Sequence, residues 1–173
     1  MSNYEIYSAG ILPYTNHKGT TYFLLGRDSD NKWSDFGGRV EPKDRSDYEI
    51  TAVREFFEET LGSVYDYDYT KKLIKKCPKI ISKTGSGHNY HMYLVKIQYT
   101  DLIRTKFLST KNFISNVVTT IDKKYIEKND IRWVSIETIE HSIEGRSLIS
   151  LRNVFSNTFK NFKKDIDILI NNK

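Results

Sequence analysis

The feature of this sequence that most constrains its fold is an acidic helix placed shortly after a glycine-rich loop. The loop, WSDFGGRVEP, spans residues 33–42 and contains Gly37 and Gly38. A helix is predicted from Asp47 to Leu61, because apolar residues recur there at intervals of three and four. These apolar residues are Ile50, Val53, Phe57 and Leu61. This spacing places them on one face of the helix.

The same predicted helix carries three glutamates, Glu55, Glu58 and Glu59, on another face. They are related by i,i+3 and i,i+4, so their carboxylates crowd together on a face that we expect to be exposed. Each like-charge pair costs roughly 0.2–0.5 kcal/mol, and Arg54 alone cannot neutralise three acids. A divalent metal with a preference for oxygen ligands, such as Mg²⁺, would supply the missing charge. The alternative interpretation is an ordinary solvated helix face.

Other segments predict an α/β domain. Four runs rich in β-forming residues predict strands at Glu5–Pro13, Thr20–Leu25, Tyr90–Tyr99 and Ile131–Val134. A turn is predicted at Gly85–Gly87, and His88 and His91 beyond it are expected at surface or edge positions. Apolar residues from Leu148 to Leu169 predict an amphipathic C-terminal helix, broken near its middle. Strands interleaved with helices indicate one α/β layered domain over residues 1–173.

Composition narrows the class of protein. The net charge is +5, which suits an anionic ligand, although a Lys-rich surface without a binding role is the favoured explanation. The lysines are scattered, and no single basic tract indicates an RNA-binding arm. No apolar run approaches the roughly 20 residues that cross a bilayer, and Cys77 is the only cysteine. We therefore expect a cytoplasmic protein with no membrane partner.

Together the loop and the helix resemble the Nudix box, written G-x5-E-x7-R-E-U-x-E-E-x-G-U with U an aliphatic residue. Gly38 matches the first glycine, and Arg54-Glu55-Phe56-Phe57-Glu58-Glu59 match the core of the pattern. Two departures stand out. Arg54 lies sixteen residues after Gly38 instead of fourteen. The pattern places its closing glycine at position 61, where this chain has Leu61, and the glycine follows one residue later as Gly62. Two extra residues therefore sit in the loop or the first helical turn. The outer glutamate of the pattern corresponds to Asp44 when counted from Gly38 and to Ser46 when counted back from Arg54, and we favour Asp44 because it is an acid.

The resemblance implies a Nudix fold, an α/β/α sandwich with a mixed central sheet, and a bound Mg²⁺ or Mn²⁺. Glu55, Glu58 and Glu59, with the carbonyl of Gly38, would be the metal ligands, and Arg54 would orient a glutamate of the box. The residue that activates water would be a box glutamate or an acid on a later loop, with Glu127 and Asp130 as candidates. The candidates for substrate contact are Arg27, Trp33, Arg39 and Asp44, and Trp33 is equally well a core residue.

The reaction implied is magnesium-dependent hydrolysis of the diphosphate linkage in a small nucleoside diphosphate derivative. Two alternatives remain open. One is removal of the cap from messenger RNA, which the positive charge favours and the lack of a concentrated basic tract disfavours. The other is a non-catalytic Nudix-fold module that binds a nucleotide, which the retention of Glu55, Glu58 and Glu59 disfavours. The sequence makes no prediction about the oligomeric state.

Overall fold

The structure is a computed structural model that describes residues 7–146 and 149–171. Its centre is a mixed sheet built around the long strand β1 (Ser8–His17). One edge of β1 pairs antiparallel with β4 (Phe36–Arg39) in its first half and with β2 (Thr20–Asp28) in its second half. Its other edge pairs in parallel with β6 (Asn89–Lys96). This pairing brings the glycine pair of β4 to the middle of the sheet.

Four further strands complete the sheet. β5 (Lys79–Lys83) pairs antiparallel with β6 and forms one edge. β2 pairs antiparallel with β3 (Lys32–Ser34) and with β7 (Lys128–Ser135). The short β8 (Ser150–Leu151) pairs in parallel with β3. The predicted mixed sheet is therefore confirmed.

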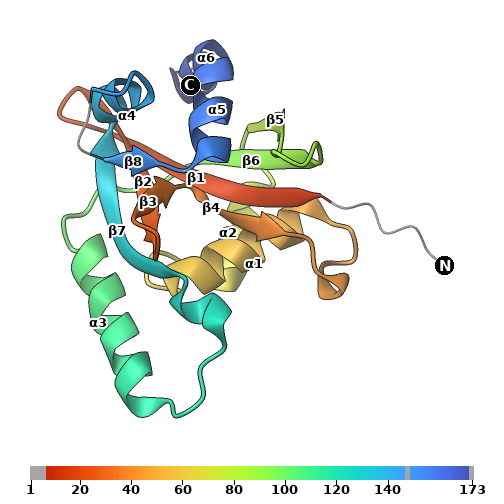
Figure 1. The fold of residues 1–173 in the computed structure, drawn as a ribbon, viewed down its shortest axis with the longest axis vertical. Helices are drawn as coiled ribbons and strands as arrows, with labels where there is room; N and C mark the ends of the chain where they lie inside the picture. The colour runs from red at the N-terminus through yellow and green to blue at the C-terminus, as the bar shows by residue number, and fades with distance from the viewer. Residues whose placement is uncertain (1–6, 147–148, 172–173) are drawn as a thin grey trace.

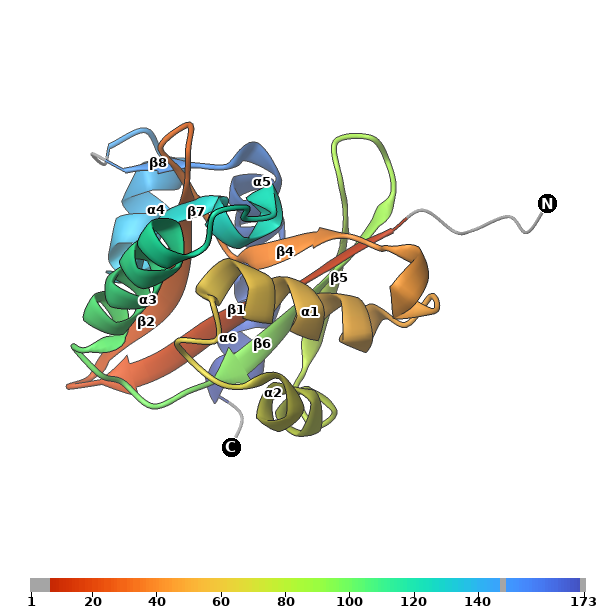
Figure 2. The ribbon, with the colours of Figure 1, turned by 90° about the horizontal axis from the view of Figure 1, so that it is seen from below.

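Helices cover both faces of this sheet (Figures 1 and 2). One layer contains α1 (Tyr48–Thr60), α2 (Tyr67–Ile74) and α3 (Ile103–Val117). The opposite layer contains α4 (Ile136–Ile143), α5 (Asn153–Asn161) and α6 (Lys163–Asn171). None of the helices in the described ranges is both long and apolar enough to cross a membrane.

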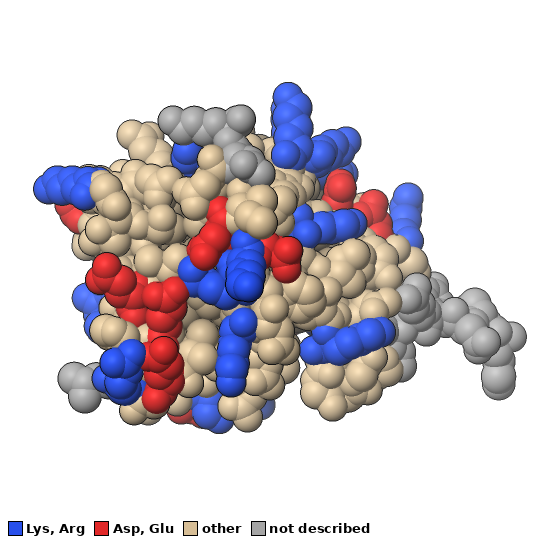
Figure 3. Space-filling model, turned by 90° about the horizontal axis from the view of Figure 1, so that it is seen from above, with Lys and Arg blue, Asp and Glu red and all other residues tan. Residues whose placement is uncertain are grey.

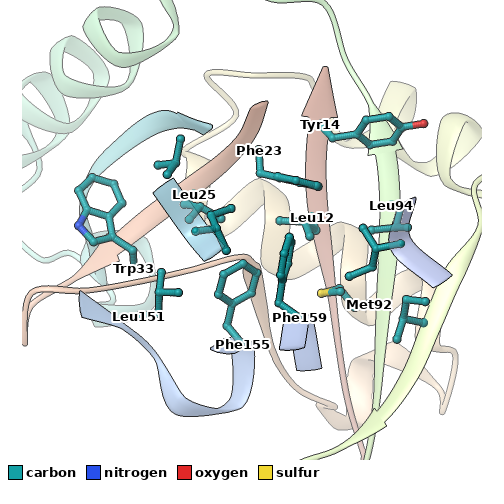
Figure 4. Packing of buried hydrophobic residues seen from close by; sticks show 14 of the residues in the cluster. Leu12, Tyr14, Phe23, Leu25, Trp33, Met92, Leu94, Leu151, Phe155 and Phe159 are labelled. Atoms are coloured by element: carbon teal, nitrogen blue, oxygen red, sulfur yellow. The ribbon is translucent and has the colours of Figure 1, made fainter. Parts of the chain in front are cut away.

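Alternation along the central strands creates two hydrophobic cores. On β1, Ile11 belongs to the core under α1 to α3, whereas the next residue, Leu12, belongs to the core under α4 to α6. The second core is seen in Figure 4, where Phe155 and Phe159 of α5 reach toward the sheet. Phe159 meets Phe23 of β2 edge-on, with ring centroids 5.4 Å apart. An α/β/α sandwich follows, as the sequence predicted.

The predicted strands are confirmed as β1, β2, β6 and β7, with shifted ends, and the turn at Gly85–Gly87 is present. The C-terminal segment is indeed two helices that meet at Phe162, although Leu148 lies outside the described residues, as do Glu5 and Ile6. His91 differs from the prediction of a surface or edge position. It is buried and stacks on Tyr48 of α1, with ring centroids 3.7 Å apart.

The predicted apolar stripe of α1 is only partly right. Val53 is buried, but Ile50, Phe57 and Leu61 are half-buried. The core face is formed instead by Ala52, Val53 and Phe56, because α2 covers the side of α1 that carries Phe57. The helix begins after the cap Asp47, which accepts hydrogen bonds from two backbone N–H groups of the first turn. It ends at Thr60, with Leu61 and Gly62 both left-handed, at φ 56° and 62°.

Candidate active site

Gly38 brings β4 and α1 into close contact. A Cβ atom at this position would lie 2.5 Å from Oε1 of Glu55, so only glycine allows the carboxylate to approach the strand. Gly37 allows an equally close approach between β4 and β1, because a Cβ atom at this position would lie 2.7 Å from the Cα of Gly10. The double glycine therefore sets the distance between the central sheet and the acidic helix.

Arg54 gathers the acidic groups at this contact. Its guanidinium is buried and donates to Glu55 at 2.8 Å and Glu58 at 3.1 Å through Nη1. Nε and Nη2 donate to the two oxygens of Asp44, each at 2.9 Å, and Nη2 also donates to the carbonyl of Arg39 at 2.9 Å. A planar guanidinium with five donors suits this task. Arg54 thus holds the helix, the turn before it and the end of β4 in one arrangement.

The turn between Asp44 and α1 can accommodate two residues more than the box pattern predicts. Arg45 and Ser46 adopt left-handed backbone conformations, with φ of 53° and 59°, and both are exposed. Looping them out leaves Asp44 at its expected position after Gly38, where it still pairs with Arg54. The departure from the usual spacing therefore leaves the ion pair intact.

Asp44 is fully buried, which leaves it no exposed surface for the substrate contact that the sequence suggested. Besides Arg54, it accepts hydrogen bonds from Thr51 Oγ1 at 2.9 Å and from the Glu41 N–H at 2.8 Å. Burial by itself would raise the pKa of Asp44, but these donors outweigh burial and lower the pKa below its ordinary value. Asp44 therefore holds the guanidinium of Arg54 in place.

The three glutamates are largely enclosed, and the prediction of an exposed acidic face is wrong. Glu58 and Glu59 are buried and Glu55 is half-buried, because β4 and β7 lie against this side of α1. Burial raises the pKa of Glu55 to about 7, against the opposing effect of Arg54. Burial also raises the pKa of Glu59 to about 8, against the opposing effect of Lys128. These carboxylates therefore lack sufficient positive charge around them.

Lys128 is a member of the cluster that the sequence did not reveal. Its side chain is buried, and Nζ donates to Asp28 at 2.7 Å and Ser34 at 3.1 Å and lies 3.3 Å from Glu59 Oε1. Gly26 makes room for it, since a Cβ atom there would lie 2.9 Å from the Lys128 Cδ. A lysine between Glu127 and Asp130 at the start of a predicted strand looks like a surface residue, so the sequence carried no signal for this position.

The donor set fits a divalent cation. Within the described ranges, no group of three His, Cys, Asp or Glu side chains is already arranged around a common metal position. Two observations nevertheless fit the binding of a divalent cation here. Oε2 of Glu59 is buried and accepts no hydrogen bond, and the pKa values of Glu55 and Glu59 are raised by burial. Carboxylate and carbonyl oxygens are the ligands that Mg²⁺ prefers.

The two acids proposed as water-activating groups differ in their surroundings. Glu127 is exposed and close enough to Glu55 for its charge to raise the Glu55 pKa. Asp130 is buried, and both of its oxygens are engaged, by Arg104 at 2.7 and 3.1 Å and by Arg132 at 2.9 Å. Its pKa is lowered by these arginines despite burial, so Asp130 resists accepting a proton. Glu127 is therefore the better candidate of the two for accepting a proton from water.

Trp33 belongs to the core. It is 5% exposed and packs with Leu151, and the guanidinium carbons of Arg27 and Arg132 lie 5.7 and 5.4 Å from its ring centroid. Arg27 is half-buried against this ring, whereas Arg39 is exposed at the end of β4. Of the predicted substrate contacts, Arg39 alone lines the cleft described next.

A cleft of about 530 Å³ adjoins the glutamate cluster at Gly38, which lines the cleft and contacts Glu55. Its walls are the end of β4, the turn before β6 and the first turn of α5. Viewed from above, a notch indents the lower edge of the molecule, with Lys or Arg side chains on both sides of it (Figure 3). The structure therefore joins an acidic cluster to a basic cleft.

No family model matches the sequence. Its similarity to an uncharacterized protein of Acanthamoeba polyphaga mimivirus is 44% identity over 59 residues, which covers 31% of this chain and only 19% of that protein. The NUDIX domain of Shewanella oneidensis NrtR, complexed with ADP ribose, superposes with a TM-score of 0.58 at 12% identity, over 95% of this chain and 90% of that one. The chain has the Nudix fold.

Two further structures with this fold agree. An Ap4A hydrolase of C. elegans superposes with a TM-score of 0.54 at 18% identity, over 92% of this chain and 98% of that one. A NUDIX hydrolase from Nitrosomonas europaea gives a TM-score of 0.51 at 14% identity, over 95% and 73% of the two chains. Likeness at such low identity establishes the Nudix architecture, and the reaction must be argued from the site.

Proposed function

We propose that this protein is a Nudix hydrolase that uses Mg²⁺ or Mn²⁺ to cleave the diphosphate linkage of a small nucleoside diphosphate derivative. One observation carries the proposal. Arg54 gathers Glu55 and Glu58 beside the double glycine of β4, at the end of a cleft rimmed by basic residues. Clustered acids next to a basic cleft suit a metal that bridges the protein and a diphosphate.

In this proposal Glu55, Glu58, Glu59 and the carbonyl of Gly38 hold the metal. The bound ion would polarise the phosphoryl oxygens and lower the pKa of water. Arg54 is a positioning residue, because its guanidinium orients Glu55 and Glu58 from a buried place. Stabilising the leaving phosphate and accepting the proton of the attacking water are assigned to side chains at the edge of this cluster.

Two exposed residues complete the proposed mechanism. Arg39 contributes a positive charge at the mouth of the cleft, where it would stabilise the negative charge that develops on the leaving phosphate. Glu127, close to Glu55, is the proposed acceptor of the proton from the attacking water. Its exposed carboxylate can accept this proton and release it to solvent.

The named ligands of the structural neighbours support the substrate class. ADP ribose is bound by the Shewanella oneidensis domain, and Ap4A is the substrate named for the C. elegans enzyme. Both compounds carry phosphoanhydride linkages attached to nucleosides. Retention of all three box glutamates favours hydrolysis over a module that only binds nucleotides. Capped RNA remains a candidate substrate and belongs in the test panel.

The test is turnover of a panel of diphosphate compounds with Mg²⁺, with products identified by mass spectrometry. The panel contains ADP ribose, a nucleotide sugar, Ap4A and a capped oligonucleotide. We expect hydrolysis of at least one compound, abolished by EDTA. The Glu58→Gln variant should lose this activity, whereas Glu137→Gln, which alters an exposed acid on α4, should keep it. Tight binding of a nucleotide without turnover would favour the non-catalytic module.

A further inference from the structure

The cleft presents positive charge at its rim. Lys32, Arg39 and Arg152 line it, and all three side chains reach solvent. Arg152 is held by Asp28, with Nη2 3.0 Å from Oδ2, and Asp28 in turn accepts a hydrogen bond from Lys128. The first turn of α5 follows directly after Arg152 and also lines the cleft. A phosphate at the rim would meet this positive charge.

The floor of the same cleft carries an acid. Asp35 lines the cleft together with Tyr90, whose hydroxyl donates a hydrogen bond to Asp35 Oδ2. The two side chains are only 6% and 5% exposed. Gly10 and Gly37 leave the space that the Tyr90 hydroxyl occupies, since a Cβ atom at either would lie 2.5 or 2.8 Å from it. Asp35 is the single residue between β3 and β4, and Tyr90 lies on β6, so strands of the sheet hold both side chains in place.

Placing Asp35 at the floor costs stability, because burial raises its pKa to about 6. The hydrogen bond from Tyr90 and the charges of Lys128 and Arg152 lower the pKa of Asp35 and so favour its ionised form. An ionised acid here repels phosphate and accepts hydrogen bonds from hydroxyl or amino groups. A strained polar group that faces a cleft is typical of a recognition site.

The walls disfavour a flat base as the occupant of the floor. Among the described residues that line the cleft, the aromatic rings are Tyr90 and Phe155, and both are buried, with Phe155 only 1% exposed. His88, at the turn before β6, is half-buried and is the one other ring. A nucleobase would therefore find no open Phe, Tyr or Trp face on which to stack.

We propose that this cleft binds the sugar phosphate half of the substrate, with Asp35 accepting hydrogen bonds from the sugar hydroxyls and Arg39 and Arg152 binding the phosphate. The inference rests on the proposed function, in which the diphosphate lies at Gly38, because it places the sugar beyond that diphosphate. It identifies the substrate class as compounds whose diphosphate joins a nucleoside to a second, hydroxyl-rich group. Asp35 is then a residue that determines specificity.

The experiment is a binding measurement by titration calorimetry without metal, which separates this inference from the question of turnover. The probes are ribose 5-phosphate and tetrahydrofurfuryl phosphate, which has the same ring and phosphate but lacks the ring hydroxyls. A hydrogen bond from a hydroxyl to a charged acceptor is worth roughly 1.5–3 kcal/mol, so we expect ribose 5-phosphate to bind at least ~10-fold tighter. Adenosine, which has no phosphate, should bind far more weakly.

Variants assign this preference to particular residues. Asp35→Asn keeps an acceptor for Tyr90 but loses the charge, and it should reduce the preference to less than about threefold without weakening the binding of tetrahydrofurfuryl phosphate. Arg152→Gln should weaken both probes by a similar factor. The control Asp165→Asn, on the exposed side of α6, should match the wild type.

Equal affinity of the wild type for the two phosphates would overturn the inference, as would an unchanged preference in Asp35→Asn. The comparison of probes on the wild type stands even if Asp35→Asn does not fold. If the protein prefers ribose 5-phosphate yet hydrolyses no compound of the diphosphate panel, the cleft assignment survives and the proposed hydrolase function fails.

Discussion

Replacing Asp44 by asparagine tests whether this acid positions Arg54 or contacts substrate. The carboxylate is fully buried and accepts four hydrogen bonds, two of them from Arg54 at 2.9 Å. Asparagine keeps one acceptor oxygen and turns an NH₂ group toward at least one donor. Removing one partner of a buried ion pair costs about 3–5 kcal/mol, and the retained oxygen reduces this to roughly 2–4 kcal/mol.

The assay is urea unfolding at two pH values. With a slope of about 2 kcal/mol per molar urea, the midpoint at pH 7 should fall by roughly 1–2 M in Asp44→Asn. The pKa of Asp44 is lowered in the folded protein, so its stabilising effect is present above the ordinary value of 3.8 and is lost as pH falls through the lower, folded value. The difference in stability between the two proteins should therefore narrow as the pH falls below 3.8 and through the lowered pKa of Asp44. Asp165→Asn is the matched control.

The stability and the kinetics of Asp44→Asn together distinguish a positioning role from substrate contact. If Asp44→Asn unfolds at the wild-type urea concentration but shows a higher KM for the diphosphate substrate, Asp44 contacts substrate and our view of its role is incorrect. If the ion pair positions the glutamates, kcat should fall together with stability, because Arg54 then loses the acid that fixes it beside Glu55 and Glu58.

Three further predictions concern neighbouring groups. Glu58→Gln should lower turnover at least ~100-fold while the protein still folds, judged by circular dichroism, because it removes a proposed metal ligand; unchanged turnover excludes this role. Gly38→Ala should cost about 1–3 kcal/mol in urea unfolding and lower kcat, since its Cβ would lie 2.5 Å from Glu55 Oε1, and a fully active variant would contradict the close packing. Burial raises the pKa of Asp35 from 3.8 to about 6, so Asp35 should lower wild-type stability by up to ~3 kcal/mol between pH 4 and pH 6, in addition to the losses caused by the raised pKa values of Glu55 and Glu59. Asp35→Asn should lose less stability than the wild type over this range by the same amount. Identical pH profiles for wild type and variant would refute the last prediction.

Much of the fold was predictable because its strands and main helix carry strong local patterns. The β runs of β1, β2, β6 and β7 are rich in apolar, branched and aromatic residues, and α1 has a capping Asp47 and a closing Gly62. No helix was predicted at α3, where only Ile103 and Phe107 are buried among Lys, Asn, Ser and Thr residues. Such a helix is stabilised by packing on β7, and its apolar period is too weak to detect.

The sequence predicted part of the acidic cluster but not its surroundings. Helical spacing and the resemblance to the Nudix box brought Gly38, Arg54 and the three glutamates together, but they implied an exposed acidic face. The structure buries that face because β7 returns beside α1 and inserts Lys128 next to Glu59. That contact joins residues far apart in sequence, and no local pattern encodes it. The acid at the floor of the cleft, Asp35, was hidden for the same reason, since its partner Tyr90 lies on a distant strand.

The most direct test of the central claim is Mn²⁺ binding, followed by electron paramagnetic resonance, with and without the non-hydrolysable α,β-methylene ADP. The account predicts that the wild type binds Mn²⁺ and that the nucleotide tightens this binding, because the acidic helix and the diphosphate share the ion. It also predicts that a Glu58→Gln, Glu59→Gln double variant binds Mn²⁺ at least ~100-fold more weakly. Equal Mn²⁺ affinity in the wild type and the double variant would contradict the claim that these glutamates hold the metal.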